Sequence, residues 1–215
     1  MITLLPAEHL PNRPFTHPHH TPREHEILRY MLEKLYIFLE TILQYTQLFD
    51  IINHPEADGR NCRYVIPRPP LLALADNLAV VGFFGQKRLE AGSDHFGNLG
   101  EFIMRAIPNL PDILGYSNME LENGDFSNLV LLRGDNVKSA WLEGADHARA
   151  VDLSPAYYNT VRIYNGTLPG GVAAPRSLSL TKVKYYDFSC DPHWRGERKL
   201  LVLWESAGRS PDFGV

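Results

Sequence analysis

Histidine, asparagine, tyrosine and arginine side chains carry the chemistry that this sequence offers. His147 lies in a segment with helical spacing, residues 137–151, six residues after Trp141. A helical imidazole near a pocket can act as a general base or as an axial ligand of haem. A histidine that pairs with Asp146 or Asp152 on the helix surface explains the same pattern without catalysis, so both interpretations stay open.

Two asparagines fall on segments expected to pair as strands. Residues 114–121 and 126–132 flank an Asn-Gly dipeptide, which is the strongest local signal of a β-hairpin. Alternation places Tyr116 and Asn118 on one face of the first strand and directs Asn128 to one face of the second. An amide in an apolar cavity could bind a carbonyl or phenol oxygen, whereas on a solvent face it would do nothing specific. A shift of one residue in register exchanges these outcomes.

An aromatic cluster, AYYNTVRIY, contains Tyr157, Tyr158 and Arg162 and precedes a Pro-Gly-rich loop at 165–176. Aromatic rings and one guanidinium could form the wall of a pocket and hold an anionic group of a ligand. Aromatic core packing is the alternative, although a buried Arg162 would then need a partner. We count Phe84, in the strand FFGQKR, among the residues expected to bind substrate.

The N-terminal arm carries a histidine-rich run with His17, His19 and His20, followed by His25. Imidazoles bind zinc, copper and nickel, but a specific site needs a fixed geometry that a proline-broken arm does not supply. We therefore expect no functional metal. The two cysteines are far apart and form no CxxC pair, which favours free thiols in a reducing compartment.

Signatures of common nucleotide-dependent enzymes and hydrolases are missing from the chain. It contains no GxGxxG after a strand, no P-loop, no GxSxG and no HExxH. The formal net charge of -4 and the lack of a Lys/Arg run give no reason to expect a nucleic-acid partner. No signal peptide is expected at the N-terminus, and polar residues interrupt the apolar segment 28–52, so we expect a cytoplasmic protein without a membrane span.

The elements expected to position these side chains form four parts and a tail. Residues 1–21 are expected to be an irregular arm and 22–54 a long amphipathic helix. That helix is expected to start with a capping box of Thr21 and Glu24. Residues 55–77 are expected to be a linker, 78–205 the main α+β domain and 206–215 a frayed tail.

The expected elements of the main domain are strands at 78–86, 114–121, 126–132, 178–188 and 200–204, and helices at 99–107 and 137–151, with a short helical turn through 157–158. The order β–α–β–β–α–β is the ferredoxin-like arrangement, so the fold class expected is α+β. The features that carry a family resemblance are FFGQKR, the hairpin GYSNMELENGDFSNLVLL, and the helix with Trp141 and His147. With these features, residues 78–205 resemble the dimeric α+β barrel superfamily, whose members include antibiotic-biosynthesis monooxygenases and haem-degrading enzymes.

The resemblance implies a cofactor-independent monooxygenase- or cyclase-like enzyme of biosynthesis that acts on a hydrophobic or aromatic small molecule. In this hypothesis His147 moves a proton while Tyr158 or Asn128 polarises an oxygen; Tyr116, Asn118, Trp141, Tyr157, Arg162 and Phe84 bind substrate. A haem protein with His147 as ligand and a non-catalytic ligand-binding or interaction module are the alternatives. The apolar face of an open sheet also predicts a homodimer.

Overall fold

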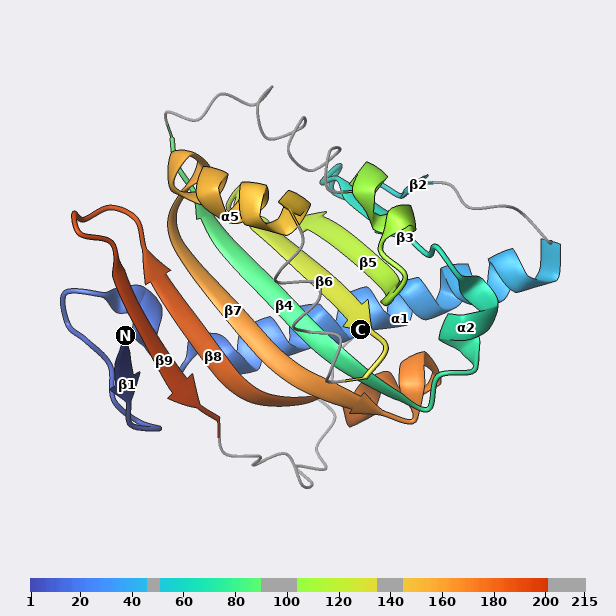
Figure 1. Ribbon diagram of the computed structural model, residues 1–215, viewed down its shortest axis with the longest axis horizontal. Coiled ribbons are helices and arrows are strands. Elements are labelled where there is room, and N and C mark those ends of the chain that lie inside the picture. Colours follow the sequence, from blue (N-terminus) through green and yellow to red (C-terminus); the bar gives the residue numbers. More distant parts are fainter. Residues whose placement is uncertain (46–50, 90–103, 135–144, 201–215) are drawn as a thin grey trace, which may run out of the picture.

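The computed structural model describes residues 1–45, 51–89, 104–134 and 145–200. Nine strands of these residues form one sheet in the order β1-β9-β8-β7-β4-β6-β5-β3-β2. The long helix α1 (His20–Tyr45) crosses one face of the sheet, and α5 (Ala145–Tyr157) lies on the other (Figure 1). The expected mixed class of helices and strands is therefore confirmed. Within the described part of the chain, no helix is long and apolar enough to cross a membrane.

The centre of the sheet is antiparallel. Its strands are β4 (Asn77–Lys87), β5 (Ile113–Glu120), β6 (Phe126–Leu132) and β7 (Tyr158–Pro169). β4 pairs with both β6 and β7, and β6 pairs with β5. The expected hairpin joins β5 to β6, and Gly124 at its turn has a φ of 79°, a backbone conformation that glycine adopts without steric cost.

The outer strands come from both ends of the described chain. β8 (Ser179–Asp187) and β9 (Trp194–Lys199) follow β7, and β1 (Ile2–Leu4) adds to β9 in parallel. On the other side β3 (Cys62–Val65) pairs with β5, and β2 (Ile51–Asn53) forms the edge. Short helices connect these strands: α2 (Pro69–Ala73) and 3₁₀ turns at Pro14–Thr16, Ile107–Asn109, Gly171–Ala173 and Pro175–Ser177.

Several expected elements are wrong in position. The helix expected to continue to residue 54 cannot do so, because Ile51–Asn53 is strand β2. Its capping box is also absent, since the Glu24 carboxylate is bound by Arg162. The expected linker at 55–77 contains β3 and α2, and the expected irregular arm contributes β1.

The C-terminal third shows two further differences. Residues 158–169 form the long strand β7, because β4 and β8 supply hydrogen-bond partners on both of its sides. The helical turn expected through 157–158 and the loop expected from 165 are therefore wrong at residues 158 and 165–169. The final described strand is the polar segment Trp194–Lys199, which lies between the strands expected at 178–188 and 200–204. The strand expected at 200–204 lies almost wholly outside the described residues, as do most of the helix expected at 99–107 and the first half of that at 137–151.

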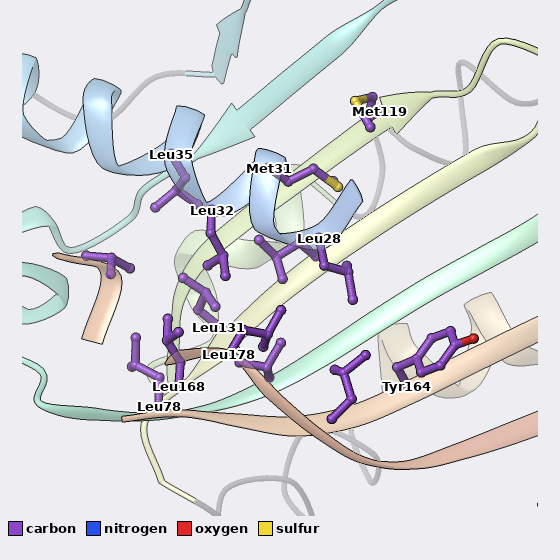
Figure 2. Packing of buried hydrophobic residues seen from close by; sticks show 14 of the residues in the cluster. Leu28, Met31, Leu32, Leu35, Leu78, Met119, Leu131, Tyr164, Leu168 and Leu178 are labelled. Carbon is purple, nitrogen blue, oxygen red and sulfur yellow. The ribbon is translucent and has the colours of Figure 1, made fainter. Parts of the chain in front are cut away.

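The main core lies between α1 and the sheet. Leu28, Met31, Leu32, Leu35 and Leu39 recur at helical spacing and are at most 1% exposed. Figure 2 shows several of these side chains against residues of the sheet. Burial of each such side chain contributes about 1.5–3 kcal/mol, so the stripe anchors the helix to the sheet.

Side chains alternate between two faces of the sheet, which we name by the helices that cover them. The α1 face carries Phe84, Leu129, Leu131 and Tyr164, which share one hydrophobic cluster with α1. The α5 face carries Val65, Tyr116 and Val130 in a second cluster and Tyr158 and Val161 in a third. Each face therefore has its own packed layer, and each strand supplies residues to both.

Candidate functional site

The cavity of interest lies on the α1 face, at the N-terminal end of α1. Its volume is about 1060 Å³, and its wall combines the start of α1, arm residues 12–15, and the strand ends near 84–86, 119–125, 160–162 and 187–189. This volume is at the upper end of the range in which proteins bind drug-sized organic molecules. The cavity therefore has room for a sizeable small molecule.

The floor of the cavity is partly apolar. Phe84 and Met119 are only 2% and 3% exposed, and Ile27 of α1 lies on the same wall. The Phe84 ring stands edge-on to Tyr164, with ring centroids 5.8 Å apart. That contact fixes the orientation of the Phe84 ring, so the floor offers a preformed surface to an apolar ligand.

A buried ion pair lies beside this floor. The Arg162 Nε donates to the two Glu24 carboxylate oxygens at 2.8 and 3.1 Å, and Nη2 donates to Oε1. The side chains are 15% and 5% exposed. Burial opposes the charged form of Arg162, but the Glu24 carboxylate outweighs that effect and raises the pKa of the guanidinium. Among the described residues, Nη1 of Arg162 has no hydrogen-bond partner.

Two more polar groups face the cavity near this pair. The Thr160 hydroxyl donates to Gln86 Oε1 at 3.1 Å across the paired strands. His20 lies 3.3 Å, through Nε2, from the Pro14 carbonyl. Burial, reinforced by the nearby Arg162 charge, lowers the pKa of His20 to about 4. The imidazole is therefore neutral at pH 7; if Nε2 donates to Pro14, Nδ1 is left as an acceptor.

The N-terminal arm closes one side of the cavity and is fixed by Arg198. This arginine of β9 is 1% exposed, and it donates to the carbonyls of Leu5 at 3.2 Å and Thr16 at 2.8 Å, and to that of Glu8. It also donates to the Tyr185 hydroxyl. A buried charge held by several carbonyls is costly to release, so the arm is a fixed wall rather than a loose segment.

A largely buried ion pair adds to this wall. Arg13 Nε lies 3.2 Å from Asp187 Oδ2, and its guanidinium stacks over the Trp194 ring at 4.8 Å. Asp187 also accepts from the backbone N–H of Ser189 at 3.0 Å. These contacts join the arm to the end of β8 next to the cavity.

The residues expected to form the site are divided by the sheet. Phe84 and Arg162 line the cavity, whereas Tyr116, Asn118, Asn128 and Tyr158 lie on the α5 face. The expectation that these residues line one common pocket is therefore wrong.

A β-bulge explains the position of Tyr158. The pairing of β4 with β7 shifts between Gln86 and Lys87, so that Gln86 faces Thr160 and Lys87 faces Tyr158. An extra residue in one strand reverses the direction of the side chains beyond it. Tyr158 consequently packs against Phe83 on the α5 face, with ring centroids 5.2 Å apart, and not beside Arg162.

The expected proton carrier cannot be placed in either site. His147 belongs to α5, but the structure does not describe its side chain, and Trp141 lies outside the described residues. Tyr157 ends α5 and is partly buried against Tyr158 and Val161. The catalytic role of His147 and the haem alternative therefore stay predictions.

On the α5 face the two asparagines form a polar ladder with an arginine. Asn118 lies directly opposite Asn128, and its Nδ2 donates to Asn128 Oδ1 at 2.5 Å. Arg63 of β3 donates through Nη2 to Asn118 Oδ1 at 3.3 Å. The expected pairing of the two strands is confirmed. Arg63 was missed because it lies in the segment that we took for a linker.

Sequence reasoning also missed Glu24 and His20 as cavity residues. Glu24 was assigned to a helix cap, and His20 was counted with the histidine-rich arm. One signal could have indicated Glu24: a buried Arg162 needs an acidic partner from elsewhere in the chain. Across the described ranges, no three His, Cys, Asp or Glu side chains are arranged to hold a metal ion.

Comparison of the sequence with known proteins assigns no family to the chain. No model of a protein family matches the chain, and no curated protein is significantly similar to it.

Proposed function

We propose that the protein binds a small organic molecule in the cavity on the α1 face. The observation that carries this proposal is a cavity of about 1060 Å³ with a preformed apolar floor beside the buried Arg162–Glu24 pair. Binding sites typically combine an apolar wall with a few fixed polar groups that orient the ligand. Here Phe84 and Met119 supply the wall, and Arg162 Nη1 and the neutral His20 supply a donor and an acceptor.

For the activity, we propose the cofactor-independent monooxygenase- or cyclase-like chemistry that the resemblance implies. The support within this cavity is His20, whose low pKa keeps a neutral imidazole next to the ligand volume. A neutral imidazole with a low pKa can accept a hydrogen bond from a bound molecule and orient it, while the adjacent guanidinium of Arg162 stabilises negative charge that develops on it. Arg162 thereby takes the role expected of Tyr158 or Asn128, which lie on the other face of the sheet. The proton transfer expected of His147 stays a prediction.

We also propose that residues 77–169 form a ferredoxin-like βαββαβ unit. It is supported by the order β7-β4-β6-β5, in which every neighbouring pair is antiparallel. In a dimeric barrel the apolar sheet faces of two copies would pack together, but α1 covers the α1 face here (Figure 1). The reason for expecting a barrel-type homodimer is therefore weakened, and sedimentation equilibrium of the purified chain tests the oligomeric state.

The test of ligand binding uses a variant that fills the cavity. Gln86 lines the cavity from an exposed position on β4, so Gln86→Trp introduces bulk there without disturbing the core. Thr181→Trp places the same side chain on an exposed position of β8 and serves as the control. A panel of aromatic and aliphatic small molecules is screened by ligand-observed NMR against all three proteins.

We expect hits for the wild type that persist with Thr181→Trp and disappear with Gln86→Trp. Hits that persist with Gln86→Trp, or a panel without any hit, would contradict binding in the cavity. For the activity, turnover of a confirmed ligand is measured with His20→Gln and with the neighbouring His19→Gln as its control. Equal turnover by the two variants would remove His20 from the mechanism.

A further inference from the structure

A second polar site lies on the α5 face, separated from the cavity by the sheet itself. Its residues come from three adjacent strands: Arg63 from β3, Tyr116 and Asn118 from β5, and Asn128 from β6. The register places Arg63 opposite Asn118 and Val65 opposite Tyr116. Arg63 and Tyr116 are therefore diagonal neighbours on the same face, within reach of long side chains.

Two polar atoms in this group are buried without a partner. Tyr116 is 2% exposed, and among the described residues its hydroxyl finds no hydrogen-bond partner; the buried Nε of Arg63 likewise has none there. An unsatisfied buried donor costs about 1–3 kcal/mol, and native proteins seldom retain one without a reason. Burial also raises the pKa of the Tyr116 hydroxyl, against the influence of Arg63, so Tyr116 is a neutral O–H donor at pH 7.

The charge of Arg63 is unbalanced as well. Its protein contact is the neutral oxygen of Asn118, and no carboxylate in the described ranges forms an ion pair with it. Arg162 on the other face of the sheet has Glu24, and Arg60 in the same region of the chain has Asp58. A half-buried guanidinium normally has such a partner, because removal of a charge from water is costly.

The unused groups are therefore a cation with a free N–H and a neutral hydroxyl, and no anion in the described ranges balances the cation. We propose that Arg63 and Tyr116 form a binding site for the carboxylate of a small organic acid. A carboxylate can accept the Nε–H of Arg63 and the Tyr116 hydroxyl while it balances the guanidinium charge. Ile51, Val81 and Leu110, which are partly buried and pack against the cluster that contains Tyr116, offer an apolar surface to the body of the acid.

The hydrogen-bonded amides of Asn118 and Asn128 hold the Arg63 side chain in position. Asn118 uses its oxygen to hold the Arg63 Nη2 and its nitrogen to hold Asn128, so that the guanidinium cannot turn away. Pairing between strands explains these two bonds without a ligand. It does not explain the unpaired Tyr116 hydroxyl or the uncompensated Arg63 charge, and these two features carry the proposal.

The experiment follows the Arg63 Nε–H resonance of the full-length protein by ¹H–¹⁵N NMR while formate, acetate or benzoate is added. Benzamide, which has the shape of benzoate without its charge, is the ligand control. Arg63→Met and Tyr116→Phe test the site, and Arg60→Met removes a nearby guanidinium that already has a carboxylate partner. Gln86→Trp serves as a control on the other face.

We expect a saturable shift with all three carboxylates, strongest for benzoate, and a much weaker one with benzamide. Loss of a charge-assisted hydrogen bond should weaken benzoate binding by about tenfold or more in Arg63→Met, as followed by isothermal titration calorimetry. Tyr116→Phe should weaken binding several-fold, by about one neutral hydrogen bond, and leave the melting temperature unchanged or higher, since it removes an unsatisfied hydroxyl. Arg60→Met and Gln86→Trp should bind benzoate like the wild type.

Three results would overturn the proposal. The first is the absence of a saturable shift with any carboxylate, and the second is unchanged benzoate binding by Arg63→Met. The third is a clear fall in the melting temperature of Tyr116→Phe, which would show that the hydroxyl has a structural partner. Because the site and the cavity lie on opposite faces, failure here leaves the cavity proposal standing, and the reverse also holds.

Discussion

The buried pair of Glu24 and Arg162 gives the most direct test of how the cavity floor is built. Glu24→Gln leaves the Arg162 charge in a place where the two side chains are 5% and 15% exposed. Loss of one partner from a buried pair costs about 3–5 kcal/mol, because the remaining charge has lost its compensation. We expect a decrease of that size in the free energy of unfolding for Glu24→Gln and for Arg162→Met.

The double variant Glu24→Gln/Arg162→Met should be destabilised by much less than the sum of the single variants, since it leaves no buried charge. The control is the ion pair of Arg23 and Glu122, in which Nη2 lies 3.7 Å from Oε2. These side chains are 75% and 72% exposed. Arg23→Met should cost less than about 1 kcal/mol. Urea denaturation with a common m-value measures all four variants. Equal costs for Glu24→Gln and Arg23→Met, or additive single variants, would refute the reasoning.

Four further changes test other parts of the structure. Arg198→Met should release the N-terminal arm and lower the free energy of unfolding by about 2–4 kcal/mol. The arm should then be cut by limited proteolysis; an arm that stays protected would show that Arg198 does not hold it. Gly166→Ala should destabilise by more than about 2 kcal/mol in urea, because its Cβ would lie 2.2 Å from the Ser179 carbonyl oxygen. The pKa of His20 falls from 6.5 to about 4 on folding, so the unfolded chain takes up the proton first. The free energy of unfolding should therefore fall as the pH decreases from 6.5 to 4, and the urea midpoint should fall less steeply in His20→Gln. An equally steep fall in that variant would contradict the role of His20. Deletion of residues 1–54 should expose the α1 face and cause aggregation, and a soluble, monodisperse product by light scattering would oppose it.

The long helix and the central hairpin were predictable because their signals are local. Leucines at three- and four-residue spacing mark the buried stripe of α1, and the Asn-Gly turn fixes the register that places Asn118 opposite Asn128. The strand at 77–87 was found in the same way from its β-branched and aromatic residues. These features depend on few residues from elsewhere in the chain.

The edges of the sheet were not predictable for the opposite reason. β9 is a polar segment, WRGERK, which is a strand because β8 and β1 pair with its two sides. Arg198 in that strand is buried only because three carbonyls of the arm meet it. Neither local propensity nor alternation indicates such long-range partners.

The separation of Tyr158 from the cavity residues follows from one irregularity in the pairing of β4 with β7. Up to the bulge beyond Gln86, β7 directs Arg162 and Thr160 to the cavity. Past it, Tyr158 turns to the α5 face and packs against Phe83. In a regular strand Tyr158 would lie on the same face as Thr160 and Arg162. Because the bulge separates them, a substitution at Tyr158 should alter the α5 layer and leave ligand binding in the cavity unchanged.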